Sequence, residues 1–478
     1  MYFIIIAVLV VFLMFLLKTF KYRKKDPLPG ELVSFKLTEE IKEKLKKAIR
    51  IKTITNSDYS LNDIKEFKKI PNFINENYPL VIEKLEMCSL NDYSYIFKWS
   101  GTDQILKPIL LIAHFDVVPV VEKNWSVPPF EGVEKDGFIW GRGALDTKNT
   151  FTGILESAQL LLGENFTPER TIYMAFGGDE ETMGSEGAGK INEYFKSINI
   201  DFEWVLDEGG IVAEDSLSMV KNPLALIGIS EKGYTNIRIS SEAHGGHSSM
   251  PPEHTAAGLV ARAVTKIENH PFPAKITPTI SAFLYGITPH VSFPIAIVLA
   301  NHKIFTPVIK KLLLQSDTTA ALLRTTQAVT ILSSGQKENV LPSSGEAIIN
   351  MRILPGETVS SVLQRVRNLL KKNQVKVEIA DSGDSNDPIR ESSLSSEGYT
   401  VIQSVIEQTF PGSITVPYMM TGATDSKHYK EICKDIYRFA PMSLNSREIG
   451  LIHSADERIS LENYGKTITF YKELMKKI

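Results

Sequence analysis

Short apolar segments alternate with amphipathic segments through the first half of the chain. Residues 108–116, 170–178 and 202–210 are apolar runs of strand length, and residues 146–163 and 185–197 have the periodicity of helices. Strands that alternate with helices of this length are typical of βαβ units, in which the strands pair in parallel and helices cover both faces of the sheet. The pattern predicts an α/β fold with a mainly parallel sheet flanked by helices.

The hydrophobic pattern changes near residue 230. Six segments then have the patterns of strand, helix, strand, strand, helix and strand, at residues 233–241, 255–269, 328–334, 346–353, 358–372 and 375–380. This order is typical of a ferredoxin-like α+β layer. The proline-containing residues 271–325 predict an irregular stretch within it. We therefore expect a main domain in two parts, 35–228 and 383–478, with a separate domain inserted at 229–382.

The N-terminus differs from the rest of the chain because its first 17 residues carry no charge. As a helix they span about 25 Å, close to the roughly 30 Å hydrocarbon core of a bilayer. A cleaved signal peptide needs a basic segment before the apolar run and small residues after it, and neither is present. We therefore expect an uncleaved, single-pass transmembrane anchor at residues 1–25. The basic residues after the run favour a cytoplasmic globular part, whereas glycosylation triplets at Asn124 and Asn165 favour the opposite side, so the orientation stays open.

The charge balance and the cysteine count exclude some classes of binding partner and of metal site. The 478 residues include 53 basic and 56 acidic side chains, a net charge of −3 that offers no general attraction to nucleic acid. Cys88 and Cys433 are the only cysteines, which excludes a disulfide framework and a cysteine-based metal site. Any metal ion must therefore be held by histidine, aspartate and glutamate.

Histidines and acidic side chains follow the predicted strands where each strand ends, which is where active groups gather in open parallel sheets. They are His114 and Asp116, Glu180 and Glu181, Asp207 and Glu208, together with Asp146 after "WGRGAL" and His453 near the C-terminus. Neighbouring buried carboxylates repel one another and lose solvation, so they need a counter-charge. Two divalent cations about 3.5 to 4 Å apart supply it, and histidine with carboxylate ligands suits zinc. The pattern predicts a dinuclear metal site.

Nine motifs resemble, in order and spacing, those of the M20 metallopeptidase family. They are "HFDVVP", "WGRGALDTK", "GGDEETMGSEG", "LDEGG", "GGHSSMPP", "NVLP", "NMRILPGE", "TGATDSKHY" and "HSADERI". The branch that they resemble most is that of carboxypeptidase S and the N-fatty-acyl-amino-acid synthase/hydrolases. The resemblance covers residue 38 to the C-terminus. It implies that the main domain is a zinc-peptidase-like catalytic domain and that the inserted domain is a lid and dimerisation domain.

The resemblance also implies a role for each ligand. Asp146 would bridge two Zn²⁺ ions per subunit, for which cobalt or manganese are substitutes. His114 and an acid of "LDEGG" would complete the ligand set of one ion. Glu181 and His453 would complete the ligand set of the other. Asp207 is preferred because it comes first after the apolar run, with Glu208 as the alternative. The peptide bond from Asp146 to Thr147 would be cis.

Two further acids would act beside the metals. Glu180 would be the general base, taking a proton from the attacking water and delivering it to the leaving amine. Asp116 would accept a hydrogen bond from the second ring nitrogen of His114 and so fix its tautomer.

Four residues are expected to bind substrate on the strength of the same resemblance. His247 would stabilise the oxyanion, in many family members in a neighbouring subunit's site. Asn339 and Arg352 would bind substrate, with the guanidinium suited to a carboxylate, and the backbone at Gly422 would hold the same carboxylate. Ala423 replaces the more usual glycine, which bears on the shape of the pocket and not on the chemistry.

The expected function is a zinc-dependent hydrolase that cleaves an amide bond next to a free carboxylate. Its substrate would be a short peptide, for a carboxypeptidase, or an N-acyl amino acid, for a hydrolase of such conjugates. A homodimer through the inserted domain is the expected assembly. The alternatives are a membrane-tethered aminoacylase or dipeptidase and a non-catalytic, metal-binding homologue.

Overall fold

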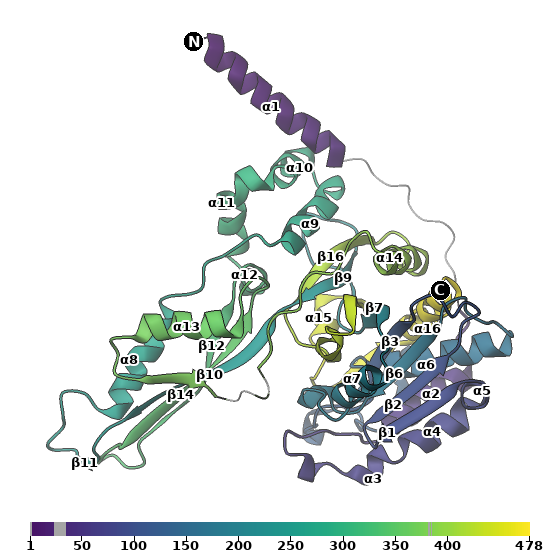
Figure 1. Ribbon diagram of the computed structural model, residues 1–478, viewed down its shortest axis with the longest axis horizontal. Helices are drawn as coiled ribbons and strands as arrows, with labels where there is room; N and C mark the ends of the chain where they lie inside the picture. Colours follow the sequence, from purple (N-terminus) through teal and green to yellow (C-terminus); the bar gives the residue numbers. More distant parts are fainter. Residues whose placement is uncertain (1, 23–34, 381–382, 384) are drawn as a thin grey trace.

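A large, mostly parallel sheet forms the centre of the main body. The computed structural model describes residues 2–22, 35–380, 383 and 385–478 (Figure 1). In these residues ten strands pair in the order β1-β2-β6-β3-β7-β17-β9-β8-β18, with β16 also beside β9, and the central strands β6, β3, β7 and β17 are parallel. The strands are β1 (Glu86–Asn91), β2 (Ser94–Trp99), β3 (Ile109–His114), β6 (Ile172–Gly177), β7 (Phe202–Asp207), β8 (Val212–Ala213), β9 (Leu224–Glu231), β16 (Ile414–Met420), β17 (Cys433–Arg438) and β18 (Ser443–Leu444).

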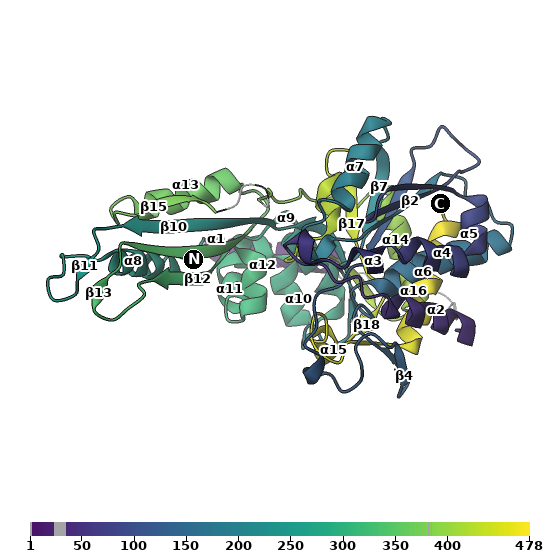
Figure 2. The same cartoon turned by 90° about the horizontal axis from the view of Figure 1, so that it is seen from below.

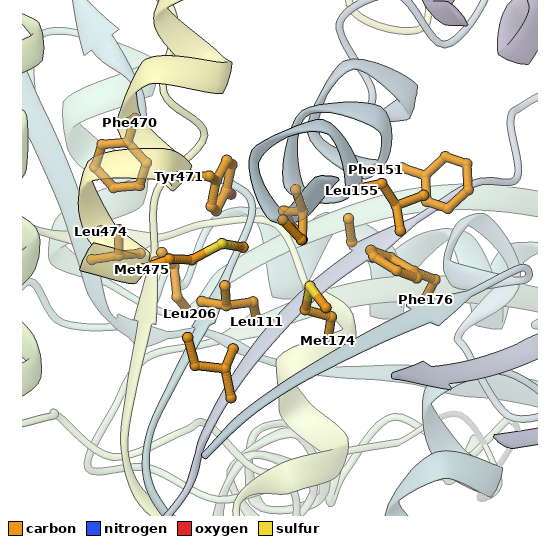
Figure 3. Close-up of a cluster of buried hydrophobic side chains, with 14 of the residues drawn as sticks. Leu111, Phe151, Leu155, Met174, Phe176, Leu206, Phe470, Tyr471, Leu474 and Met475 are labelled. Atoms are coloured by element: carbon orange, nitrogen blue, oxygen red, sulfur yellow. The ribbon is translucent and has the colours of Figure 1, made fainter. Parts of the chain in front are cut away.

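Helices cover both faces of this sheet, which confirms the predicted α/β class. One face packs against α4 (Ile70–Asn77), α5 (Pro79–Lys84), α6 (Lys148–Gly163), α14 (Glu397–Thr409) and α16 (Leu461–Lys476), and the other against α7 (Ala188–Ser197). Leu111 of β3 faces the larger cluster with Phe151 and Phe470 (Figure 3), whereas Leu110 and Ile112 face the opposite side. Because both faces are buried, the strands read as continuous apolar runs.

The inserted domain contains a second, antiparallel sheet in the order β12-β14-β10-β15. Two helices, α8 and α13, pack on one face of it. Its elements follow the predicted order: β10 (Gly233–Glu242), α8 (Ala256–Glu268), β12 (Thr326–Ser334), β14 (Ser344–Ile353), α13 (Val359–Leu370) and β15 (Lys376–Ile379). The layer extends away from the main body, with the short pair β11 (Gly246–His247) and β13 (Val340–Leu341) at its far end (Figures 1 and 2). The domain limits at 229 and 382 stay a prediction.

Most of residues 278–323 are helical, so the predicted irregular stretch at 271–325 is wrong. They form α9 (Pro278–Ile287), α10 (Phe293–Ala300), α11 (His302–Leu313) and α12 (Asp317–Leu323). Prolines stand in the first turn of α9 and of α10, where the missing N–H has no helical partner to lose. Proline therefore begins α9 and α10, and Pro307 lies inside α11, whereas the sequence interpretation took the proline-containing stretch to be irregular.

The predicted membrane anchor is also wrong. Residues 2–22 form the helix α1 (Tyr2–Tyr22), but none of the described helices has the length and apolar character needed to cross a membrane. The transmembrane segment and the membrane location expected from residues 1–25 are thus contradicted. The C-terminal half of α1 lies against the inserted helices instead, with Phe15 beside Phe305 and Tyr22 stacked on Tyr285. Residue 1 and the basic residues 23–25 lie outside the described residues.

A small sheet brings two distant segments of the chain together. It contains β4 (Val133–Lys135), β5 (Phe138–Trp140) and β19 (Arg458–Ser460), and β5 pairs with both of the others. The loop after β5 leads to Asp146, and the loop before β19 contains His453. Pairing β5 with β19 therefore places these two loops side by side. The remaining short elements are α2 (Glu39–Arg50), α3 (Ile64–Phe67), α15 (Ser446–Ile449) and five 3₁₀ turns, at Tyr59–Leu61, Glu122–Asn124, Glu180–Thr182, Thr288–His290 and Asp425–Tyr429.

Lys232 joins the two large sheets. It is the single residue between β9 and β10, and it is 1% exposed. Its ammonium group donates to the backbone oxygens of Ala321 and Arg324, both at 2.9 Å, so the joint is held by the end of α12. Burial, with the nearby Arg352, lowers the pKa of Lys232 to about 7.

We predict that Lys232→Met changes the pH dependence of stability. Between pH 7 and pH 10 the unfolded chain holds a proton on Lys232 that the folded chain has lost, because its unfolded pKa is near 10.5. The wild type should therefore gain free energy of unfolding with rising pH relative to the variant, by at most about 1.4 kcal/mol per pH unit. Urea unfolding at several pH values measures this. The exposed Lys221→Met is the control, and parallel pH profiles for wild type and Lys232→Met would contradict the assignment.

Candidate metal centre

Asp146 lies at the middle of the site, between two histidines. Its Oδ1 is 3.0 Å from Nε2 of His114, and its Oδ2 is 2.9 Å from Nε2 of His453. Glu208 joins Asp146 and His114, and Glu181 joins Asp146 and His453, to give two groups whose ligand atoms all lie within 4.8 Å of one another. The two groups share Asp146, which is the arrangement expected of a carboxylate between two cations.

The topology of the sheet explains why these residues meet. His114 is the last residue of β3, Glu181 lies in the 3₁₀ turn after β6, and Glu208 directly follows β7. These three strands are parallel neighbours in the order β6-β3-β7, so their carboxyl ends lie at one edge. Asp146 and His453 reach the same edge on the two loops that β5 and β19 hold together. The Asp146–Thr147 peptide bond is cis, as expected.

Glu208, and not Asp207, belongs to the ligand group with His114. The buried Asp207 carboxylate instead accepts hydrogen bonds from the backbone N–H groups of Glu208 and Ser426, both at 2.8 Å. Asp207 is the last residue of β7 and 1% exposed. The glycines that follow Glu208 allow the backbone of this loop to pack closely against β9. A Cβ on Gly210 would lie 1.9 Å from the backbone oxygen of Leu226, so only glycine fits there.

Burial disfavours the charged forms of the acids around Asp146. Burial raises the pKa of Glu180 and of Glu208 well above their usual range, and raises that of Glu181 to about 7. For Asp146 burial acts in the same direction, but hydrogen bonds with the two histidines outweigh it and lower the pKa. Oε1 of Glu181 is buried and lies 3.1 Å from Nε2 of His453. A carboxylate oxygen beside an imidazole nitrogen fits a pair of ligands to one metal ion.

Asp116 holds two parts of the site in place. Its Oδ1 is 3.3 Å from Nδ1 of His114 and accepts the backbone N–H of Glu180, and its Oδ2 accepts the backbone N–H of Glu181 and the hydroxyl of Thr55. The Asp116 side chain is fully buried. The side chain therefore fixes the turn that carries both glutamates, and the backbone oxygen of Asp116, 3.2 Å from Nδ1 of His114, holds the imidazole together with the carboxylate.

Glu180 lies beside the ligands but belongs to neither group. Its Oε2 is 3.9 Å from Nε2 of His114, and its side chain is 13% exposed. Adjacent residues thus take different positions, with Glu181 among the ligands and Glu180 at the edge of the centre.

Glu457 and Arg142 connect the loops that carry Asp146 and His453. Glu457 accepts the backbone N–H groups of Gly143, Leu145 and Asp146, at 2.7 to 3.1 Å. Arg142 donates to Glu457 at 2.5 Å and to the backbone oxygen of His453 at 3.1 Å. Sequence reasoning missed this ion pair, although both charges stand inside motifs, in "WGRGAL" and "HSADERI".

Asp179, the first of three consecutive acids, is held within the fold. It accepts hydrogen bonds from the hydroxyl of Tyr59 at 2.6 Å and from the backbone of Glu186 and Gly187, both at 2.7 Å. Burial raises its pKa to about 6. Asp179 closes the loop that follows β6 and so supports the turn with the two functional glutamates. Tyr59 could not be found from sequence, because it lies 120 residues away from its partner.

The expected substrate binders lie in three different places. His247 and Asn339 are neighbours at the far end of the inserted domain, where Ser248 N–H donates to the backbone oxygen of Asn339 (Figures 1 and 2). Arg352 lies at the other end of this sheet, with its guanidinium carbon 4.8 Å from the centre of the Tyr234 ring. Within one chain the structure does not bring His247 or Asn339 to Asp146.

Gly422 lies in the loop after β16, which is tied to the metal centre. In this loop Thr424 donates to Glu231 at 3.2 Å, and Ser426 donates to Asp207. Glu231 in turn accepts from the buried Arg438 at 2.9 Å. Gly422 itself is exposed, and a Cβ there would meet nothing within 4 Å.

The site geometry agrees with a comparison against known families. Residues 110–477 match the profile of Peptidase family M20/M25/M40. The chain belongs to this family. It is therefore an M20-type metallopeptidase.

The relatives are carboxypeptidase S-like proteins and N-fatty-acyl-amino acid enzymes. A probable carboxypeptidase S-like 2 of Dictyostelium discoideum is 37% identical, over 98% of this chain and 92% of the relative. The human N-fatty-acyl-amino acid synthase/hydrolase PM20D1 is 36% identical, over 91% of this chain and 87% of the relative. The structure of an M20 metallo-carboxypeptidase from Sulfolobus solfataricus aligns with a TM-score of 0.69 at 17% identity, covering 92% of this chain and 99% of that one.

We predict that Glu457→Gln weakens metal binding by about 10- to 100-fold, because the loop that carries Asp146 loses its buried anionic acceptor. The substitution keeps the size of the side chain, so circular dichroism should show a folded protein. Zinc affinity is measured by competition with a chelating dye. The exposed Glu462→Gln serves as the control, and equal zinc affinities for Glu457→Gln and wild type would refute this role.

Proposed function

We propose that this chain is a zinc-dependent hydrolase that cleaves an amide bond beside a free carboxylate. One observation carries the proposal: two ligand groups share Asp146, and the free carboxylate of Glu180 stands next to them. The substrate is a short peptide that loses its C-terminal residue, or an N-acyl amino acid. Relatives with both kinds of name support these two substrate classes.

The donor set suits two zinc ions. We assign His114, Asp146 and Glu208 to one ion, and Asp146, Glu181 and His453 to the other. Imidazole and carboxylate ligands fit zinc, and the buried acids supply the negative charge that two divalent cations require. When bound, the two ions would polarise the scissile carbonyl and make water more acidic. We place Glu208 in the ligand set ahead of Asp207, because Asp207 is occupied by backbone hydrogen bonds.

Glu180 would carry the proton. It takes one from the attacking water and passes it to the leaving amine, which would otherwise depart as a strongly basic anion. Its raised pKa suits this cycle, since the carboxylate must hold the proton briefly at neutral pH. A homologue that only bound metal would not need a free carboxylate in this position, so we favour the enzyme.

The substrate carboxylate would be bound by Arg352 and by the backbone at Gly422. His247 and Asn339 would act in a neighbouring subunit, because they lie together at the far end of the inserted domain from their own metal centre. The proposal therefore includes a homodimer formed through the inserted domain. Light scattering on the purified protein tests this assembly, and a monomer that is fully active would exclude it.

We predict that Glu180→Gln keeps both metal ions and lowers kcat by about 100- to 10,000-fold, because the water loses its base. Metal analysis and steady-state kinetics measure the two effects separately. Glu186→Gln, on the same loop but outside both ligand groups, should leave kcat unchanged. If Glu180→Gln turned over substrate at the wild-type rate, the role assigned to Glu180 would be refuted.

A substrate screen should detect hydrolysis of dipeptides or N-acyl amino acids and none of the same compounds with the carboxylate amidated. A chelator should abolish the activity, and added zinc should restore it, because the bound metals polarise the carbonyl. Product release followed by mass spectrometry measures both. Equal rates for the acid and amide substrates would contradict recognition of a free carboxylate, and activity that survives complete metal removal would contradict the metal dependence.

A further inference from the structure

Four polar side chains lie together on the face of the inserted sheet opposite α8 and α13. Along β10 buried and partly buried side chains alternate, so every second residue points away from these helices. Tyr234 and Arg352 are direct cross-strand partners on β10 and β14, and Asn236 and Asn350 form the pair two residues further along. All four therefore share this face, at the end of the sheet that Lys232 joins to the main body.

Arg352 differs from other basic residues of this face because it has no anionic partner. Arg238 lies 3.3 Å from Glu346, and Lys376 lies 2.7 Å from Glu378. In the described part of the chain, the Arg352 side chain makes neither a hydrogen bond nor an ion pair. A partly buried guanidinium group without an acid is suited to binding an anionic ligand.

The charged groups near Arg352 also favour an anion. Burial lowers the pKa of Lys232, and the positive charges of Arg352 and Arg324 act in the same direction. Glu357 acts in the opposite direction, but its carboxylate already accepts a hydrogen bond from Lys275 at 2.6 Å. Among these residues positive charge exceeds negative charge, and an anionic ligand would offset it.

The ring of Tyr234 holds Arg352 where an acid would otherwise do so. The guanidinium carbon lies 4.8 Å from the ring centre, within the roughly 6 Å over which a cation and an aromatic face attract each other. This attraction leaves the N–H donors of Arg352 available, and a carboxylate can accept two of them in parallel. Asn236 donates to the Tyr234 hydroxyl at 2.9 Å and accepts from Asn350 at 3.0 Å. These two hydrogen bonds hold the ring in place.

We propose that Tyr234 is a positioning residue, whose ring holds the guanidinium group of Arg352 in the geometry that binds the free carboxylate of the substrate. The inference rests on the proposed function, in which Arg352 binds that carboxylate. Without the ring, Arg352 would have to be ordered when the ligand arrives, and the entropy lost would weaken binding. Tyr234 acts through Arg352 and takes no part in bond cleavage.

Binding without turnover tests the proposal. Alanylalanine and alanylalaninamide are titrated by calorimetry into zinc-loaded Glu180→Gln protein, which lacks the proposed base. The acid should bind at least about tenfold more tightly than the amide, and Tyr234→Leu in the same background should reduce this ratio to about twofold or less. Tyr234→Phe keeps the ring and should retain most of the preference. The proposal would be overturned by an unchanged ratio in Tyr234→Leu, by an equal loss in Tyr234→Phe, or by a parent protein that does not prefer the acid.

A double-mutant cycle separates positioning from a general structural effect. If Tyr234 acts through Arg352, adding Tyr234→Leu to Arg352→Met should change the affinity for the acid by less than about twofold. A structural defect would instead weaken the acid and the amide alike, and its effect would add to that of Arg352→Met. Additive losses would therefore refute positioning. Arg238→Met, on the same face of β10, is the control and should keep the preference for the acid.

A second variant covers the case in which Tyr234→Leu does not fold, as judged by circular dichroism. Asn236→Ala keeps the ring but removes the donor to its hydroxyl, so the preference for the acid should fall by about two- to fivefold. An unchanged preference in this variant would contradict the inference.

Steady-state kinetics distinguish failure of this inference from failure of the proposed function. For a substrate with a free carboxylate, Tyr234→Leu should raise KM about tenfold and leave kcat within about twofold, because the lost interaction is the same in the ground state and the transition state. Selective hydrolysis of acids with an unchanged KM in Tyr234→Leu would refute only the role of Tyr234. If no compound in the screen were hydrolysed but the binding preference depended on Tyr234, the carboxylate site would stand and the proposed chemistry would fail.

Discussion

The shared carboxylate of Asp146 is the constraint on which the rest of the site depends. Each of its two oxygens lies close to one histidine, and Glu181 and Glu208 each belong to a candidate ligand group with it. Burial makes ionisation of these two glutamates unfavourable, as their raised pKa values show. Positive charge between the acids favours their ionised forms, so metal binding and the geometry of the site are physically linked.

The fold holds this unfavourable cluster by fixing backbone around it. Parallel strands β3, β6 and β7 bring three ligand positions to one edge of the sheet, and the β5–β19 pair brings the other two loops there. Asp116 fixes the turn after β6, and Glu457 accepts the backbone of the loop that carries Asp146. Acids outside the two candidate ligand groups thus fix the backbone that carries those groups.

The alternation of strands and helices was predictable because both faces of the sheet are buried, which produces long apolar runs. The ligand cluster was predictable because strand ends are marked in the sequence by His114, Glu181 and the acids of "LDEGG". The choice between Asp207 and Glu208 was not, since it depends on a backbone N–H from Ser426, far along the chain. The helices of residues 271–325 were missed because the segment contains prolines, which begin α9 and α10 and, at Pro307, lie inside α11. The N-terminal apolar run was taken for an anchor from its length, its lack of charge and the absence of signal-peptide features.

A crystal structure of the zinc-loaded protein, with anomalous scattering measured at the zinc edge, tests the central claim most directly. The account predicts two zinc ions bridged by Asp146, one bound by His114 and Glu208 and the other by Glu181 and His453. A single ion, or two ions that are not bridged by Asp146, would contradict it.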